Sequence, residues 1–97
     1  MKRPKTGQDV LDYEILGEQA ATFGRLGREL RIALDALAAA DRGDPQRERL
    51  LAAAGNALWN FVVHRDCCGM SRTTEHALKA YAVPAEVRAR MGVVRLR

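Results

Sequence analysis

Large apolar residues recur every seven residues through the first part of the chain, and this spacing constrains the fold more than any other feature. The recurring residues are Leu16, Phe23, Leu30 and Leu37. Seven residues make nearly two turns of an α-helix, so these side chains share one face and need another apolar surface to cover them. We therefore expect one long amphipathic helix over residues 8–40. Leu26, Ala33 and the polar Gln19 fill the intermediate positions of the same seam.

The sequence DRGDP at residues 41–45 predicts the end of this helix and the start of a second one. Glycine is favoured just after a helix, aspartate caps a helix N-terminus, and proline is favoured in the first helical turn. The second helix is expected from Pro45 to Cys68. Its apolar stripe consists of Leu51, Ala54, Leu58, Phe61 and Val62. Because the connection is short, the two helices should form an antiparallel hairpin.

Two short helices are expected after Gly69, which ends the second helix. The third begins with a cap from Ser71, Thr73 or Thr74 and extends to Ala82. Pro84 interrupts the helical pattern because it has no amide hydrogen and restricts the preceding residue. A fourth helix should begin at Pro84 and end before Gly92.

The predicted fold class is therefore all-α, a long antiparallel hairpin followed by two short helices. No window combines strand-like alternation with β-branched residues. A chain of 97 residues is one domain, with a flexible basic N-terminus at residues 1–7 and a basic tail at residues 93–97. We expect one core that contains Leu16, Phe23, Leu30, Leu37, Leu51, Leu58 and Phe61.

The stretch HRDCCGMSRTTEH at residues 64–76 gathers two histidines and two adjacent cysteines. Its spacing does not match the paired Cys and His ligands of structural zinc sites, and a disulfide between neighbouring cysteines is strained. A reactive thiol is disfavoured at a helix C-terminus, where the dipole opposes a thiolate. We interpret the stretch as the end of one helix and the start of the next, with Cys68 packed as a small apolar residue.

Parts of the sequence resemble a family of short bacterial proteins of unknown function. The resemblance is carried by ALWNFVVHRDCCGM and AYAVPAEVRARMG, and it extends to DVLDYEIL near the N-terminus. It implies a small helical fold and no activity.

A second apolar surface on each long helix indicates self-association. Gly17 and Gly24 lie away from the leucine seam, and glycine inside a helix is unfavourable unless another backbone approaches closely. Trp59 and Val63 form a second stripe on the other helix, and tryptophan is enriched at interfaces. The C-terminal helices are the alternative cover for that stripe. We predict a homodimer, in which two hairpins would pair as a four-helix bundle. We also predict an unidentified protein partner.

DNA binding is the alternative function, because the basic charge lies in the last third of the chain. Residues 1–69 carry ten basic and ten acidic groups, whereas residues 70–97 carry six basic and two acidic groups. The expected third helix, turn and fourth helix outline a helix-turn-helix. The candidate nucleic-acid contacts are Arg72, Lys79, Arg88 and Arg90.

No catalytic, cofactor-binding or metal-binding residues are predicted. The sequence contains no recognisable Ser/His/acid set, phosphate-binding loop or paired-carboxylate site, so an enzyme is not expected. It also lacks a secretory signal and an apolar segment long enough to span a bilayer. We therefore expect a cytoplasmic protein with reduced thiols and no membrane partner.

Overall fold

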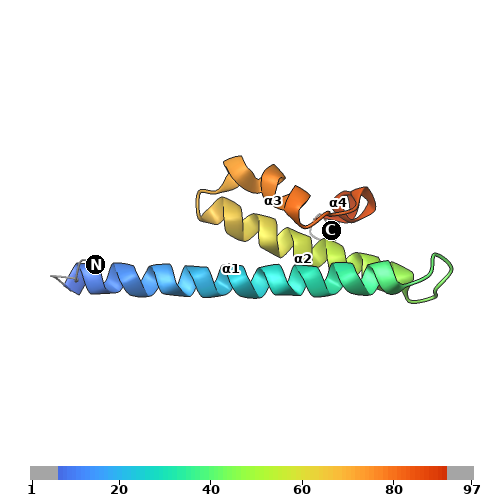
Figure 1. The fold of residues 1–97 in the computed structure, drawn as a ribbon, viewed down its shortest axis with the longest axis horizontal. Helices are drawn as coiled ribbons and strands as arrows, with labels where there is room; N and C mark the ends of the chain where they lie inside the picture. The colour runs from blue at the N-terminus through green and yellow to red at the C-terminus, as the bar shows by residue number, and fades with distance from the viewer. Residues whose placement is uncertain (1–6, 92–97) are drawn as a thin grey trace, which may run out of the picture.

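The computed structural model describes the backbone of residues 7–91 and the side chains of residues 17–91. Within this part of the chain the elements are α1 (Gly7–Ala39), α2 (Arg47–Cys67), the short 3-10 helix η1 (Ser71–Thr73), α3 (Thr74–Ala80) and α4 (Ala85–Arg90). The two long helices form an antiparallel hairpin, and the C-terminal helices lie across one face of it (Figure 1). The predicted all-α fold is confirmed.

The core lies between α1 and α2 and continues under the C-terminal helices. It consists of Leu26, Leu30, Leu34, Leu37, Leu51, Ala54, Leu58, Phe61, Leu78 and Val87. Five of the seven predicted core residues are confirmed, and Leu16 lies outside the described side chains. Phe23 is only half-buried, because it lies near the end of α2, where its ring packs edge-on against His64 with centroids 4.4 Å apart.

The buried seam of α1 is wider than the heptad spacing predicts. Leu34, which was not assigned to the seam, is buried in the core. An α-helix has 3.6 residues per turn, so a buried face drifts away from a strict seven-residue repeat. Leu34 stands four residues after Leu30, and residues at that spacing are neighbours on one face. The contact surface of α1 is therefore a broad stripe.

The turn between the long helices follows only part of the sequence prediction. The Asp44 side chain accepts a hydrogen bond from the Gln46 backbone N–H at 2.7 Å in the turn before α2. Asp44 was predicted to be the N-cap, but that position is taken by Gln46, which has no side-chain capping bond. The helix itself begins at Arg47, two residues later than expected. The prediction that Gly43 directly follows the first helix is wrong, since α1 ends at Ala39, four residues earlier.

Helices α2 and α3 both end in the same hydrogen-bonded turn. At the end of α2, Gly69 adopts a φ of 75° and the Met70 N–H donates to the Arg65 carbonyl at 2.8 Å, as in a Schellman motif. At the end of α3, Ala82 takes the equivalent position with a φ of 53°, and the Val83 N–H donates to the Leu78 carbonyl. α3 therefore ends at Ala80, two residues before the predicted boundary.

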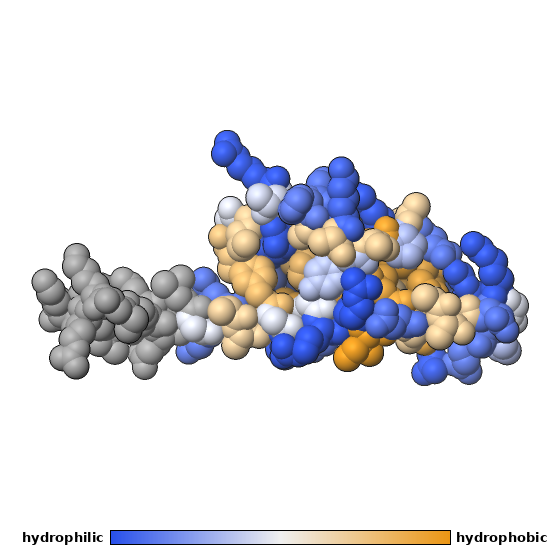
Figure 2. Space-filling model, in the orientation of Figure 1, coloured by the Kyte–Doolittle hydropathy of each residue, from blue (hydrophilic) through white to orange (hydrophobic). Residues whose placement is uncertain are grey.

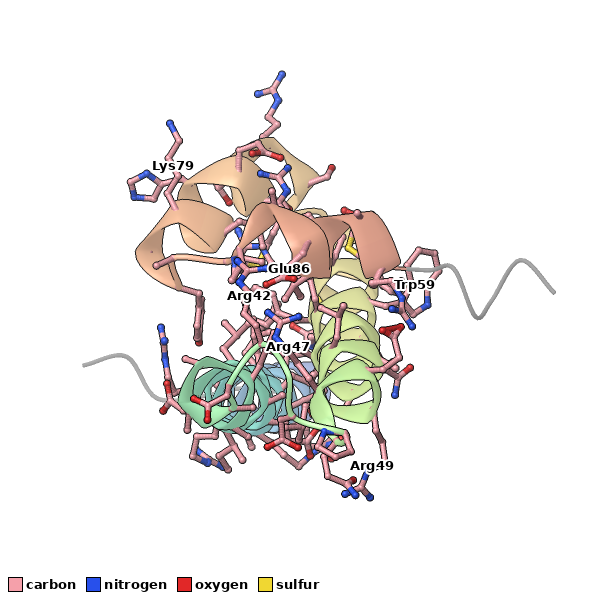
Figure 3. All side chains as sticks on the ribbon, turned by 90° about the vertical axis from the view of Figure 1, so that its right-hand side faces the viewer. Arg42, Arg47, Arg49, Trp59, Lys79 and Glu86 are labelled. Atoms are coloured by element: carbon pink, nitrogen blue, oxygen red, sulfur yellow. The ribbon has the colours of Figure 1, made fainter. Side chains whose placement is uncertain are left out.

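α4 packs against α2 through a buried valine and two ion pairs. Val87 is fully buried, and the Arg47 guanidinium donates to the Glu86 carboxylate at 2.6 Å. Arg90 forms a second pair with Glu48. Figure 3 shows Arg47 and Glu86 facing each other between the start of α2 and α4. A Cβ atom added at Gly55 would lie 3.0 Å from the Cβ of Arg90, so the two helices approach closely there.

The central position of Leu30 predicts a large stability loss on truncation. Leu30 has no exposed surface, so Leu30→Ala should lower the free energy of unfolding by about 2–5 kcal/mol through lost burial and a residual cavity. Ile32, on the same helix, is 68% exposed, and Ile32→Ala should change stability by less than about 0.5 kcal/mol. Urea unfolding followed by circular dichroism measures both. Equal losses in the two variants would contradict the burial pattern.

The Arg47–Glu86 pair predicts a pH-dependent stability. The hydrogen bond from Arg47 lowers the pKa of the Glu86 carboxyl below its ordinary value, and the same bond raises the pKa of Arg47. Ionised Glu86 therefore stabilises the fold above its unfolded pKa of about 4.3, and this contribution is lost as the pH falls through the lower folded pKa. Between about pH 5 and pH 3, the native protein should lose stability more steeply than Glu86→Gln.

Urea unfolding at successive pH values tests this expectation. Glu75→Gln is the matched control, because Glu75 also pairs with an arginine but its side chain is 66% exposed. This control should follow the native pH profile closely, since exposed ion pairs contribute little. A Glu86→Gln variant with the native profile would show that the pair does not couple folding to pH.

Candidate interaction surface

A groove between α1 and α2 lies in the surface of the hairpin, with a volume of about 470 Å³. Its lining residues are Thr22, Arg25, Leu26, Glu29, Trp59, Asn60, Val63, His64 and Cys67. We call these nine residues the hairpin groove. Leu26 gives it an apolar floor, and Trp59 and Val63 are half-buried along its α2 wall. The groove therefore combines apolar surface with a few charged side chains.

Two of the four predicted interface residues belong to this groove and two do not. Trp59 and Val63 line it, as the second apolar stripe of α2 predicted. Gly17 and Gly24 do not line it, and a Cβ atom added at Gly17 would have no neighbour within 4 Å. The structure therefore does not bring the two predicted pairs together on one surface.

The closest approaches at glycine lie inside the molecule. A Cβ atom added at Gly27 of α1 would overlap the Tyr81 hydroxyl, and Tyr81 also packs edge-on against Phe61. A Cβ atom added at Gly55 would likewise lie very close to Arg90 of α4. Neither contact has a local signal in the sequence, because both join segments that are far apart along the chain.

α1 extends beyond α2 at its N-terminal end. α1 has 33 residues and α2 has 21, a difference of twelve residues or roughly 18 Å of helix. The contact between Phe23 and His64 and the shared groove lining of Thr22 and Cys67 place the end of α2 at this level of α1. We call the part of α1 before Thr22 the overhang. Figure 1 shows it projecting past the rest of the described fold.

The stretch at residues 64–76 is organised by Arg65, which the sequence did not single out. Arg65 is 8% exposed. Its guanidinium donates to the Thr73 hydroxyl, to the Thr74 hydroxyl and to the Met70 carbonyl, the last two at 3.4 Å. It also lies over the Phe61 ring, 5.8 Å from the centroid. One buried cation thus joins the end of α2 to the start of α3, in agreement with the structural interpretation of this stretch.

The cysteines of this stretch lie in different surroundings. Cys67 is an exposed free thiol at the edge of the hairpin groove. Cys68 is half-buried rather than buried, and its sulfur lies 3.8 Å from His64 Nε2. Among the side chains of residues 17–91, no three His, Cys, Asp or Glu groups are placed to hold a metal ion.

The predicted nucleic-acid contacts divide into two pairs. Arg88 is bonded to Glu75 at 2.7 Å, and Arg90 is bonded to Glu48. Arg72 and Lys79 are exposed, and Figure 3 shows Lys79 on the opposite side of the view from Trp59. The basic groups of α4 are therefore already engaged by carboxylates within the fold.

The surface seen in Figure 2 is hydrophilic over the C-terminal helices and around the α1–α2 turn, with apolar residues between these helices and α1. Within the described residues no helix is long and apolar enough to cross a membrane.

Fold and surface together define a small all-α protein built on an asymmetric helical hairpin. The chain belongs to a family of unknown function, DUF6665, which matches residues 1–96. The resemblance seen in the sequence is thereby confirmed, and it assigns no activity. No curated protein and no solved structure matches the chain.

The role of Arg65 can be tested by a conservative substitution. Lysine retains the charge but cannot reach three acceptors with the planar fork of arginine. Arg65→Lys should therefore lower the free energy of unfolding by about 1–3 kcal/mol, because the buried cation at this position then forms fewer hydrogen bonds. Arg72→Lys is the control at an exposed position and should change stability by less than about 0.5 kcal/mol. Urea unfolding measures the free energy of unfolding of both variants. An Arg65→Lys variant as stable as the native protein would show that the hydrogen bonds of Arg65 do not stabilise this turn.

Proposed function

We propose that the protein is a non-enzymatic helical interaction module that self-associates as a homodimer and binds a protein partner. The observation that supports this most strongly is the asymmetry of the hairpin. A helix of 33 residues packs against one of 21, and a groove with apolar lining runs between them. Small domains often complete their cores by oligomerising.

The groove has the composition expected of an interaction surface. Aromatic residues dominate binding energy at interfaces, and the surrounding polar residues exclude water. Trp59 supplies a large apolar surface, and Arg25 and Glu29 supply charged groups on the α1 wall. A cytoplasmic location agrees with the two free cysteines, since reduced thiols are usual there.

DNA binding has less support as the function of the C-terminal helices. Two of its four candidate contacts, Arg88 and Arg90, are held by Glu75 and Glu48. α4 has only six residues, so it offers little more than one turn and a half to a groove of DNA.

Sedimentation at micromolar concentration distinguishes the two functions. A dimer held by apolar burial should persist in both low and high salt, because burial of apolar surface releases no counterions. DNA binding through phosphate contacts should instead weaken steeply with salt. A monomer at all salt concentrations would contradict the proposal. Nanomolar binding of one duplex sequence, lost in an Arg88→Ala, Arg90→Ala variant, would replace it with DNA binding.

Variants of the groove test where the dimer forms. Trp59→Ala should weaken dimerisation by about tenfold or more if Trp59 is an interface anchor. Thr22→Lys is a second variant that places a charge in the groove from a half-exposed position and leaves the core intact. Arg49→Ala, an exposed change on α2, is the control. Circular dichroism verifies that each variant is folded, and dimerisation unaffected by both groove variants would contradict this location.

A further inference from the structure

α4 is attached to α2 through a small number of contacts, and half of them depend on charge. Of the six residues of α4, Val87 is the buried one. Two ion pairs join α4 to the first turn of α2, Arg47 with Glu86 and Arg90 with Glu48. A helix of this length is not stable alone in water, so α4 stays helical only while these contacts hold it in place. The hairpin, in contrast, is held by buried leucines that carry no charge.

The chain before α4 allows this helix to move separately from α3. After α3, Ala82 adopts a φ of 53°, and Pro84 is extended with a ψ of 149°. No helix runs through these residues, and hinges commonly lie at such ends of elements, where a few dihedral angles absorb the change. The Arg88–Glu75 pair joins α4 to α3 and is largely exposed, so it contributes little to the attachment on α2.

Arg47 makes the attachment sensitive to the charge of Glu86. The Arg47 side chain is 18% exposed, and its buried Nε–H has no hydrogen-bond partner among the described residues. The other charged groups around the pair are Arg42, from the turn before α2, and Glu48, beside Arg47 on α2 (Figure 3). A partly buried cation is unfavourable without its counter-ion. Protonation of Glu86 therefore removes an attraction and also favours movement of α4 that lets water reach Arg47.

Close packing at Gly55 is the remaining contact between the two helices. A Cβ atom added there would lie 3.0 Å from the Arg90 Cβ and 3.1 Å from the Arg90 carbonyl oxygen. Backbone atoms cannot yield as the end of a flexible side chain does, so a larger residue at this position would push α4 outward. Glycine inside a helix is unfavourable for the helix itself. The approach of α4 therefore accounts for a glycine in the middle of α2.

We infer that α4 is an acid-released cover of α2: when Glu86 and Glu48 lose their charge, α4 separates from α2 as a unit while the hairpin stays folded. Separation exposes the side of α2 that carries Glu48, Leu51 and Gly55, which follow at spacings of three and four residues and so share one face. All of these contacts lie within one copy, so the inference does not depend on the proposed homodimer.

The direction of the pH dependence follows from the Arg47–Glu86 bond. The hydrogen bond from Arg47 holds the pKa of Glu86 below its ordinary value. The attachment is therefore complete above the pKa of a free glutamate, about 4.3, and is lost as the pH falls through the lower pKa of the attached state. The pair of Glu48 with Arg90 depends on an ionised carboxylate in the same way.

Native-state hydrogen exchange of single amides, followed by NMR, tests this inference. The Arg88 and Met91 amides donate to the Pro84 and Arg88 carbonyls, whereas the Leu30 amide lies inside α1. The protection factor is the exchange rate of an unstructured peptide at the same pH divided by the measured rate. From pH 6 to about pH 3.5, protection of the two α4 amides should fall about tenfold or more, and Leu30 should stay about a hundredfold better protected.

Two results of this measurement would overturn the inference. Equal protection of the α4 amides and the Leu30 amide at both pH values would show that α4 separates only when the whole protein unfolds. Protection in α4 that does not change with pH would show that carboxylate charge does not hold the helix in place.

Glutamine variants identify the carboxylate responsible. At pH 6, Glu86→Gln should already lower the protection of the α4 amides about tenfold, with little further change in acid, because the charge that acid removes is absent. Glu75→Gln is the matched control and should keep the native values, since its partner Arg88 joins α4 to α3. Losses of equal size in the two variants would be inconsistent with attachment through Glu86.

A substitution at Gly55 tests the attachment without a change of charge. Gly55→Ala should lower the protection of the α4 amides about tenfold at pH 6, because the added methyl group pushes α4 outward. Leu30 should lose less protection, since alanine strengthens α2 itself. Gly17→Ala is the control, because a Cβ atom there has no neighbour within 4 Å, and it should leave α4 unchanged. Native α4 protection in Gly55→Ala would refute the close contact on which the inference depends.

Discussion

Burial of the leucine seam between α1 and α2 is the interaction on which the rest of the structure depends. Leu30 and Leu58 have no exposed surface, and the neighbouring buried residues come mainly from the same two helices. Each fully buried leucine contributes about 1.5–3 kcal/mol relative to an exposed one. The C-terminal helices are too short to be stable alone, because isolated helices below about 12 residues are marginal in water. They form because Leu78 and Val87 are buried against the hairpin.

Most of the fold was predictable from the sequence because its signals are local. The seven-residue spacing of Phe23 and Leu30 identifies the long helix, and Asp44 marks the turn before the second one, where its side chain accepts a hydrogen bond from the Gln46 N–H. Gly69 adopts the left-handed conformation that glycine favours after a helix. Helix boundaries were less accurate, since the first turn of α2 and the end of α3 depend on individual hydrogen bonds.

The contacts that the sequence did not reveal join distant segments. An arginine in an amphipathic helix is ordinarily exposed, so nothing marks Arg65 as the buried donor to Thr73 and Thr74. The pairing of Arg47 with Glu86 spans 39 positions and has no local signature. The candidate groove was visible only in part, because helical spacing identifies Trp59 and Val63 as neighbours but cannot show what lies opposite them.

Ion pairs within the fold explain why the net charge of the last third of the chain is a poor guide to the charge that its surface presents. The last third of the chain is basic in sequence, yet Arg88 and Arg90 are bonded to Glu75 and Glu48. The Arg88–Glu75 pair joins α4 to α3, and the Arg90–Glu48 pair joins α4 to α2. No residue of α3 or α4 lines the hairpin groove, so this surface of α1 and α2 stays open to other molecules. A helix longer than its partner is unfavourable for a monomer, since its extra turns bury little surface, and it becomes favourable when another molecule covers those turns.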